Sequence, residues 1–188
     1  MILRILRSIA SLVPLRGGST HAPSLMPTIR PLHYDDIADV LRLNREAAPA
    51  VFRLDRSELS RLMDISALHL AVVRPDGAMA GYALAFSKDQ SYDGEEFLAF
   101  QASVADPFVY VDQIVIDERS RGTGIGRALY EALALRARRL GASALCCEVN
   151  LEPPNPRSLS FHLRIGFNVA GEISTTDGRT VALLRREA

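Results

Sequence analysis

The chain has 188 residues, a length that most simply corresponds to one domain with a substantial core. Hydrophobic residues make up 48% and charged residues 23%, which excludes a predominantly disordered chain. The 22 basic and 22 acidic side chains give a formal net charge of zero, whereas a general nucleic-acid binder needs a basic surface. We therefore expect a globular protein that does not bind nucleic acid.

The first 26 residues differ in composition from the rest. Residues 1–15 are rich in Ile and Leu but carry arginines, and residues 16–27 are rich in Gly, Ser and Pro. The apolar run of residues 8–15 is too short for a secretory signal or a membrane span, although attachment to a membrane surface stays open. We expect residues 1–26 to be a dispensable N-terminal extension, residues 27–188 to form the domain, and no integral membrane association.

Strands and helices then alternate along the chain. We expect a strand, two helices and two further strands in the first half, at residues 28–32, 35–46, 57–63, 68–73 and 79–86. Pro75-Asp76-Gly77 is a strong hairpin signal between the last two strands. Residues 88–108 show no regular pattern and predict a long irregular loop, a kind of segment that is often functional.

The next segment, YVDQIVIDERSRGTGIGR at residues 110–127, is the most informative. Residues 109–116 are apolar and β-branched enough for a buried strand, and the apolar spacing becomes helical from Ile125 to Leu140. Between strand and helix, the glycines of R-G-T-G-I-G remove side chains where the backbone must come close to something. A glycine-lined helix N-terminus flanked by arginines presents free N–H groups and suits a phosphate.

Three patterns compete for this turn. A Walker loop needs a Lys-Ser/Thr pair, which is missing. A dinucleotide-binding turn needs G-x-G-x-x-G; Gly122 and Gly124 fit its first two positions, but the third falls on Arg127. The pattern [RQ]-x-x-G-x-[GA] after an apolar strand is filled by Arg119, Gly122 and Gly124, and Gly126 extends it. This last pattern resembles the acyl-CoA loop of the GNAT superfamily of N-acetyltransferases.

A second motif follows downstream. Residues 144–149 predict another buried strand, and Asn155 before Pro156 predicts a helix cap and a first helical residue. GNAT proteins often read N-x-x-A-x-x-F-Y-x-x-x-G-F at this place. The chain has Ser158 in place of Ala and His162 in place of Tyr, and it matches the pattern at Asn155, Phe161, Gly166 and Phe167.

The predicted order of elements is βααβββαβαββ, ending with a helix at residues 156–165 and a hairpin of residues 167–173 and 180–184. We therefore expect an α/β fold with a single mixed, mostly antiparallel sheet and helices on both faces. This arrangement resembles the GNAT-like acyl-CoA N-acyltransferase fold. The resemblance implies that the strands at 109–116 and 144–149 splay apart and receive the pantetheine arm of acetyl-CoA between them.

The same resemblance implies which residues contact acetyl-CoA. Backbone groups of one strand would bond to the pantetheine arm, at Ile114, Val115 and Ile116. The glycine turn would hold the pyrophosphate, through Arg121, Gly122, Thr123, Gly124, Ile125, Gly126 and Arg127. Asn155 and Ser158 would reach the cofactor from the second motif, although a helix cap alone also explains Asn155. Metal-ligand spacing is missing, and we expect no metal.

Direct acetyl transfer to a primary amine needs a base for the ammonium, a donor for the oxyanion and an acid for the thiolate. Glu148 is the candidate base, because its place resembles the acid in E-V-x-x-x-N of N-terminal protein acetyltransferases, with two more residues before Asn155. Asp112 and Tyr110 are rivals on the neighbouring strand. His162 is the candidate acid, since it stands at the family's Tyr position. The alternatives are an exposed carboxylate and a packed histidine.

We expect an enzyme, an acetyl-CoA-dependent N-acetyltransferase whose acceptor amine belongs to a small molecule, a peptide or a protein. A non-catalytic acyl-CoA-binding sensor or regulatory module is the alternative, favoured by His162 in place of Tyr. A nucleotide oxidoreductase is a third hypothesis, which the missing third glycine disfavours. The adjacent Cys146 and Cys147 should point to opposite faces of a strand, so we expect no disulfide between them and a cytoplasmic location. A homo-oligomer remains open.

Overall fold

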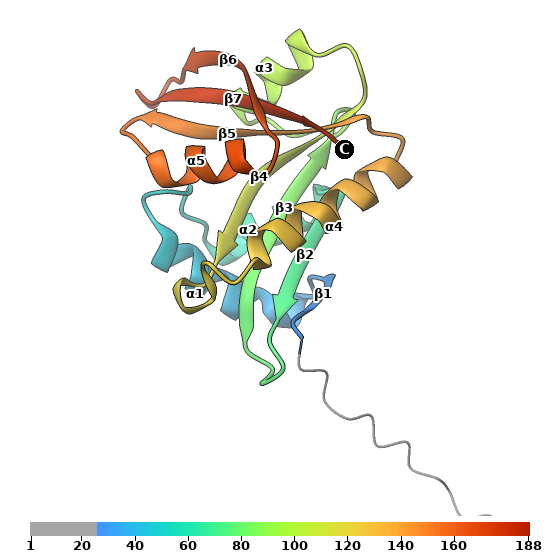
Figure 1. Cartoon of the computed structure of the whole chain (residues 1–188), viewed down its shortest axis with the longest axis vertical. Helices are drawn as coiled ribbons and strands as arrows, with labels where there is room; N and C mark the ends of the chain where they lie inside the picture. The colour runs from blue at the N-terminus through green and yellow to red at the C-terminus, as the bar shows by residue number, and fades with distance from the viewer. Residues whose placement is uncertain (1–25) are drawn as a thin grey trace, which may run out of the picture.

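The computed structural model describes residues 26–188 (Figure 1), so the predicted N-terminal extension lies outside the described residues except for its last residue. The strands of the described chain are β1 (Thr28–Pro31), β2 (Leu68–Val73), β3 (Met79–Ser87), β4 (Phe108–Ile116), β5 (Ala144–Glu152), β6 (Asn168–Ser174) and β7 (Thr180–Glu187). The α-helices are α1 (Ile37–Ala47), α2 (Arg56–Ile65), α3 (Glu95–Ser103), α4 (Ile125–Arg139) and α5 (Pro156–Arg164). Every strand and helix expected from the sequence is present.

All seven strands form one sheet in the order β1-β2-β3-β4-β5-β7-β6. Only β4 and β5 pair in parallel; the other neighbours are antiparallel. Helices α1, α2 and α3 cover one face, and α4 and α5 cover the other (Figure 1). The predicted single mixed, mostly antiparallel sheet with helices on both faces is therefore confirmed.

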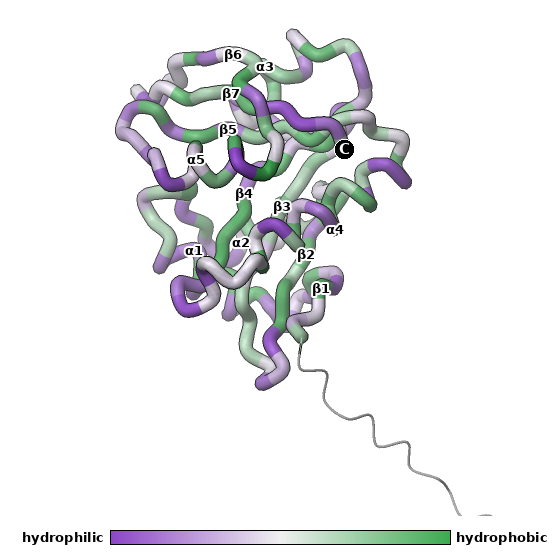
Figure 2. Tube along the Cα trace, viewed as in Figure 1, coloured by the Kyte–Doolittle hydropathy of each residue, from purple (hydrophilic) through white to green (hydrophobic). Residues whose placement is uncertain are grey.

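Strand β3 contributes side chains to both hydrophobic cores, one on each face of the sheet. Figure 2 shows hydrophobic residues concentrated along the central strands. The large β3 side chains Tyr82, Leu84 and Phe86 belong to the core under α1–α3. The alternating Ala83 and Ala85 belong to the core under α4. Because successive side chains of a strand point to opposite faces, this alternation of large and small residues lets α4 approach the sheet closely.

Helix α3 lies within the segment that the sequence predicts as an irregular loop, so that prediction is wrong for residues 95–103. Phe97 and Phe100 are its buried apolar residues, and both rings pack against Tyr110 with centroids 5.7 Å and 6.0 Å away. Two acidic residues in its first turn favour the helix N-terminus electrostatically. A nine-residue segment with two buried apolar residues has too weak a periodic pattern for a helix to be predicted from the sequence. Packing against the core stabilises the helix instead.

Strand β4 contains a bulge at Asp112. Leu84 of β3 pairs with Gln113 and the next residue, Ala85, pairs with Val111, so Asp112 is the extra residue on β4. A bulge bends a strand and redirects its side chains. Beyond the bulge, the alternation of side chains between the two faces of the sheet shifts by one residue. This shift places Ile114 and Ile116 on the face covered by α4 and α5.

Strands β4 and β5 diverge after a short parallel contact (Figure 1). Their pairing covers only Phe108–Tyr110 of β4 against 144–146 of β5. Beyond this point β4 stays paired with β3 as far as Ile116, and β5 stays paired with β7. The facing edges of β4 and β5 therefore bound a gap without strand-to-strand pairing.

Candidate active site

The glycine turn connects β4 to α4 beside this gap. Gly122 and Gly124 have φ angles of 78° and 87°, in the left-handed region that favours glycine. Gly124 is the N-cap of α4 and offers no side-chain cap, which leaves the first N–H groups of the helix available to a ligand. The Thr123 hydroxyl donates to the carbonyl oxygen of Ser120 at 2.7 Å. This end of α4 has the geometry of an anion site.

A cavity of about 670 Å³ begins at this turn and follows β4 toward α5. Phe161 forms part of its wall, and a Cβ added at Gly126 would lie 3.1 Å from the Phe161 ring. Most residues predicted to bind the cofactor line it: Ile114, Val115, Ile116, Arg121, Gly122, Gly124, Gly126, Arg127, Asn155 and Ser158. Thr123 and Ile125 do not line this cavity; Ile125 is buried in the core under α4. The cavity combines a positively charged end with an apolar groove, which fits the diphosphate and pantetheine arm of acetyl-CoA.

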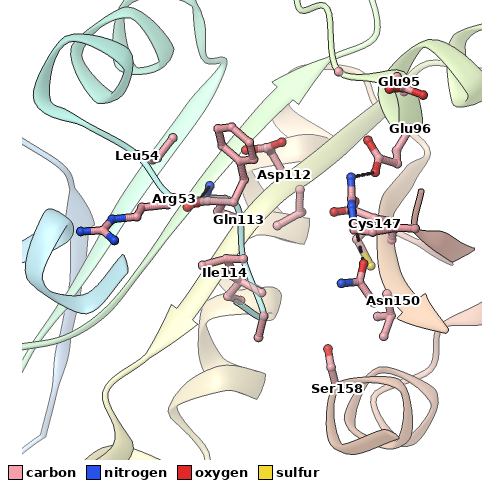
Figure 3. A pocket seen from close by; sticks show the side chains of 18 of the residues that line it. Arg53, Leu54, Glu95, Glu96, Asp112, Gln113, Ile114, Cys147, Asn150 and Ser158 are labelled. Atoms are coloured by element: carbon pink, nitrogen blue, oxygen red, sulfur yellow. Dashed lines mark hydrogen bonds and ion pairs between the residues drawn. The ribbon is translucent and has the colours of Figure 1, made fainter. Parts of the chain in front are cut away.

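A second cavity, of about 700 Å³, fills the gap between β4 and β5. Figure 3 shows Asp112 and Ile114 of β4 on one side of it and Cys147 and Asn150 of β5 on the other. The two cavities meet where they share lining residues, which are Ala50, Val51, Ile114, Asn155, Ser158 and His162. A thioester that follows the groove therefore reaches the second cavity at this junction.

Glu148, the candidate base, lies on β5 and lines the second cavity. Its Oε2 accepts a hydrogen bond from the Tyr110 hydroxyl at 2.6 Å. Burial, and next the negative charge of Asp112, raise the pKa of the Glu148 carboxyl to about 8. A carboxyl with this pKa exchanges protons near neutral pH, as a general base requires.

Asp112, the rival candidate, lies across the gap on β4. Burial raises the pKa of its carboxyl to about 6. The Tyr92 hydroxyl donates a hydrogen bond to Asp112, and the Tyr92 ring stacks on Phe86 with centroids 4.0 Å apart. Tyr110, the third candidate, is fully buried and donates to Glu148. The site therefore holds two carboxylates, each bonded to a tyrosine hydroxyl.

His162 of α5 is buried at the junction of the two cavities. Its Nδ1 lies 2.8 Å from the Ser158 carbonyl oxygen, and its Nε2 lies 2.7 Å from the Tyr130 hydroxyl. A carbonyl oxygen only accepts, so Nδ1 carries the proton and Nε2 accepts from Tyr130. Burial lowers the pKa of the imidazole, which favours this neutral form.

Asn155 caps α5, because its Oδ1 accepts from the backbone N–H of Ser158 at 3.2 Å. This contact confirms the predicted cap, with Pro156 as the first helical residue. The Ser158 hydroxyl lies 3.3 Å from His162 Nδ1. The cap thus fixes the turn of α5 that faces both cavities.

A buried polar network holds the loop between α1 and α2 against the second cavity. Asn44 donates to the carbonyl oxygen of Phe52 at 2.9 Å and accepts from the backbone N–H of Leu54 at 2.9 Å. Gln113 donates to the same Phe52 oxygen at 3.0 Å and accepts from the Tyr82 hydroxyl at 2.7 Å. Buried polar groups that are satisfied in this way rigidify a structure, so the loop forms a fixed wall.

Several contributing residues carry no sequence signal of their own. Tyr130 stands on the apolar face of α4, where a core aromatic residue is expected. Asn150 and Arg179 come together only in the fold: Arg179 donates to Asn150 Oδ1 at 3.2 Å and to Glu96 at 2.9 Å. These residues meet because β5 pairs with β7 and because α3 packs over the end of this pair.

Among residues 26–188, no group of three or more His, Cys, Asp or Glu side chains is placed to hold a metal ion. Within the same residues no helix combines the length and apolar character needed to cross a membrane. Cys146 and Cys147 are free and buried in different cores, which confirms that their side chains point to opposite faces.

Comparisons with known proteins agree with this geometry. The sequence profile of the Acetyltransferase (GNAT) family matches residues 37–167. A search of curated proteins by sequence gave no significant match. Ribosomal-protein-S18-alanine N-acetyltransferase from Escherichia coli is similar in structure, with a TM-score of 0.64 and 20% identity over 86% of this chain and 94% of that chain.

Two further solved structures show the same likeness. Ard1 from Thermoplasma volcanium has a TM-score of 0.67 and 17% identity, over 86% of this chain and 97% of that chain. A phosphinothricin acetyltransferase from Sinorhizobium meliloti, solved in complex with acetyl-CoA, has a TM-score of 0.65 and 22% identity, over 86% of this chain and 88% of that chain. At these identities the likeness shows a shared fold.

Proposed function

Because the chain belongs to the GNAT family of acetyltransferases, we propose that it transfers the acetyl group of acetyl-CoA directly to a primary amine in a ternary complex. The observation that carries this proposal is the meeting of the two cavities. One cavity begins at an anion-binding turn, and the other holds Asp112 and Glu148. A thioester and an amine can therefore meet at the junction, beside a carboxyl with a raised pKa.

The cofactor would bind along the first cavity. The free N–H groups at the start of α4, with Arg121 and Arg127 beside them, would hold the diphosphate, and Thr123 and Ile125 would take part through their backbone. The pantetheine arm would follow the unpaired edge of β4 from Ile116 to Ile114. Proximity of the two bound substrates supplies much of the rate in such a reaction.

Glu148 would act as the base and Asp112 would attract the ammonium form of the acceptor. The ammonium loses a proton to the Glu148 carboxylate, and the amine nitrogen then attacks the thioester carbonyl carbon. The C–N bond forms first and gives a tetrahedral oxyanion, and the C–S bond then breaks. The nitrogen gives up its second excess proton and the thiolate takes up one, so the products are the amide, the thiol and the proton held by Glu148. A backbone N–H on the β4 edge would stabilise the oxyanion. No step of this scheme calls for a metal.

The proton for the thiolate is assigned to the pair of His162 and Tyr130. The His162 N–H is directed at the Ser158 carbonyl oxygen, so the proton is assigned to the hydroxyl of Tyr130, which donates to His162 Nε2 and lines the second cavity. His162 would then orient that hydroxyl. This role replaces simple donation from an imidazolium, which burial disfavours.

The experiment that tests the proposal is release of free thiol from acetyl-CoA in the presence of an amine panel, with calorimetry of CoA binding beside it. Binding together with amine-dependent thiol release supports the transferase. Binding without release from any amine supports the acyl-CoA-binding sensor, which the neutral His162 favours. No binding of CoA or acetyl-CoA contradicts both functions.

We also propose that residues 27–188 suffice for this activity and that the protein works in the cytoplasm. Its two free buried cysteines are consistent with a reducing compartment. A chain that starts at Met26 should bind acetyl-CoA and turn over like the full chain. Loss of folding or of turnover in that shorter chain would assign a role to residues 1–25.

A further inference from the structure

We infer that the acceptor carries a second positive charge besides the amine that reacts, so that the substrates are di- or polycationic amines. This inference rests on the proposed function and names its substrate class. It comes from the distribution of charge around the second cavity, where seven carboxylates and three arginines line the walls. These carboxylates come from α2, α3, β4, β5 and two connecting segments, so negative charge surrounds the cavity on several sides.

The arginines do not neutralise the outer part of the cavity. Arg61 lies 2.6 Å from Glu58 and 3.7 Å from Asp93, so one cation is shared by two carboxylates. Arg179 has the same arrangement on the opposite side, 2.9 Å from Glu96 and 2.7 Å from a second carboxylate, Asp177. Each of these clusters keeps one net negative charge.

The third arginine, Arg53, is exposed, and Figure 3 shows its guanidinium directed away from the gap between β4 and β5. Asp112 and Glu148, at the centre, form no ion pair with Lys or Arg in the described part of the chain. Their hydrogen-bond donors are the hydroxyls of Tyr92 and Tyr110, which are neutral groups. The centre can therefore receive the reacting ammonium, and the outer clusters retain negative charge for another cation.

Phe52, which lines the same cavity, suits the carbon chain that joins two such charges. Phe52 is 75% exposed although Asn44 and Gln113 hold its backbone oxygen in place. An exposed aromatic ring on an anchored backbone offers apolar contact to methylene groups and attracts a cation through its face. An acceptor with a carboxylate at its far end would meet repulsion from Asp93 and the other outer acids.

The test compares three acceptors with the same four-carbon chain and different ends: 1,4-diaminobutane, butylamine and 4-aminobutanoate. We expect kcat/KM for thiol release by the full-length chain to fall in that order, by about tenfold at each step. Raising the salt from about 50 to about 300 mM should weaken the preference for the diamine, because salt screens the second charge. Equal or better use of butylamine would overturn the inference and leave the proposed function standing.

A matched pair of variants locates the second charge. Asp93→Lys reverses a charge on the cavity rim, and Asp89→Lys makes the same change on an exposed residue of the same connecting segment that does not line the cavity. We expect Asp93→Lys to reduce the ratio of diamine to butylamine kcat/KM by about tenfold, and Asp89→Lys to leave it unchanged. Equal effects of the two substitutions would overturn the inference.

Calorimetry keeps the inference testable if thiol release is not observed. The three amines are titrated into the full chain saturated with CoA, and the same order of affinity is expected. No thiol release with a clear diamine preference in binding would contradict the proposed turnover and support the charge preference. Equal affinities for the diamine and butylamine would contradict the charge preference.

Discussion

Tyr110 Oη lies 2.6 Å from Glu148 Oε2, so this hydrogen bond links β4 to β5. It lies where the backbone pairing of the two strands ends, because Tyr110 and Cys146 are their last paired residues. The hydrogen bond stabilises the ionised carboxylate, and burial opposes it and raises the Glu148 pKa to about 8. The same contact holds the carboxyl at the edge of the gap. One hydroxyl thus affects both the position of Glu148 and its titration.

The first prediction concerns the pH profile of the acetyl transfer. If Glu148 is the base, kcat/KM should rise with pH and level off above the pKa of about 8, because only the carboxylate accepts a proton. Glu148→Gln should lower kcat by about 10² to 10⁴ and remove this limb. Thiol release measured from pH 6 to about 9.5 checks both results. A Gln variant that keeps the wild-type rate and limb would exclude Glu148 as the base.

Two substitutions around Glu148 should move the rising limb of the kcat/KM–pH profile in opposite directions. Tyr110→Phe removes a bond that lowers the Glu148 pKa, so the limb should shift to higher pH. Asp112→Asn removes a negative charge that raises the pKa, so the limb should shift to lower pH. The measurement is the midpoint of the kcat/KM profile for each variant. Shifts in the same direction would contradict this account of the coupling.

The pH dependence of the free energy of unfolding should also depend on the Glu148 carboxyl. Between its ordinary value of 4.5 and the folded pKa of about 8, Glu148 holds a proton in the folded state and has lost it in the unfolded state. The folded state then binds more protons, so the free energy of unfolding falls as the pH rises through this range. Denaturant unfolding should show a smaller fall for Glu148→Gln than for the wild type. If the free energy of unfolding fell equally with pH in the wild type and the Gln variant, the pKa of Glu148 in the folded state would be ordinary.

A pair of glycine substitutions separates cofactor binding from stability. Gly124 and Gly77 have φ angles of 87° and 84°, and a Cβ would meet no atom within 4 Å at either position. Both alanine variants should therefore lose about 1 kcal/mol of stability. Only Gly124→Ala, at the start of α4, should raise the KM for acetyl-CoA, because Gly77 lies in the β2–β3 turn. Equal KM values would argue against diphosphate binding at α4.

His162 and Tyr130 should behave as one unit. His162→Phe removes the acceptor that orients the Tyr130 hydroxyl, and Tyr130→Phe removes the hydroxyl itself. We expect each variant to lose roughly tenfold or more in kcat, and the double variant to lose no more than the worse single variant. Thermal melts identify any loss of folding from the buried groups left unpaired. Unchanged turnover in His162→Phe would remove His162 from catalysis.

The sequence predicts the order of elements and the cofactor turn because both are encoded locally. The glycine turn combines an apolar strand, glycines and a helical apolar period within one short segment, so an anion site can be predicted there without the fold. Asn155 followed by Pro156 is a local cap signal in the same sense. The case for Glu148 as a base comes from the family resemblance, and the structure adds the burial that raises its pKa.

The acceptor side could not be predicted because it is built from contacts between distant segments. The bulge at Asp112 leaves no mark in the sequence, and it places Ile114 on the face of Val111 rather than on that of Tyr110. Arg179 reaches Glu96 across 83 residues of chain. Tyr92 acquires its role only when it stacks on Phe86 and meets Asp112. Such side-chain meetings follow from tertiary packing, which no local period encodes.

The sheet consists of two parts, β1–β4 and β5–β7. Only the three paired residues of β4 and β5 join these parts through backbone pairing. Glu148 is therefore tied to β4 by a side-chain hydrogen bond from Tyr110 rather than by a backbone ladder. A single substitution at such a bridge can retune the distance between the acids without disturbing strand register. We expect such substitutions to change the width of acceptor that the gap admits without altering the turn at the start of α4.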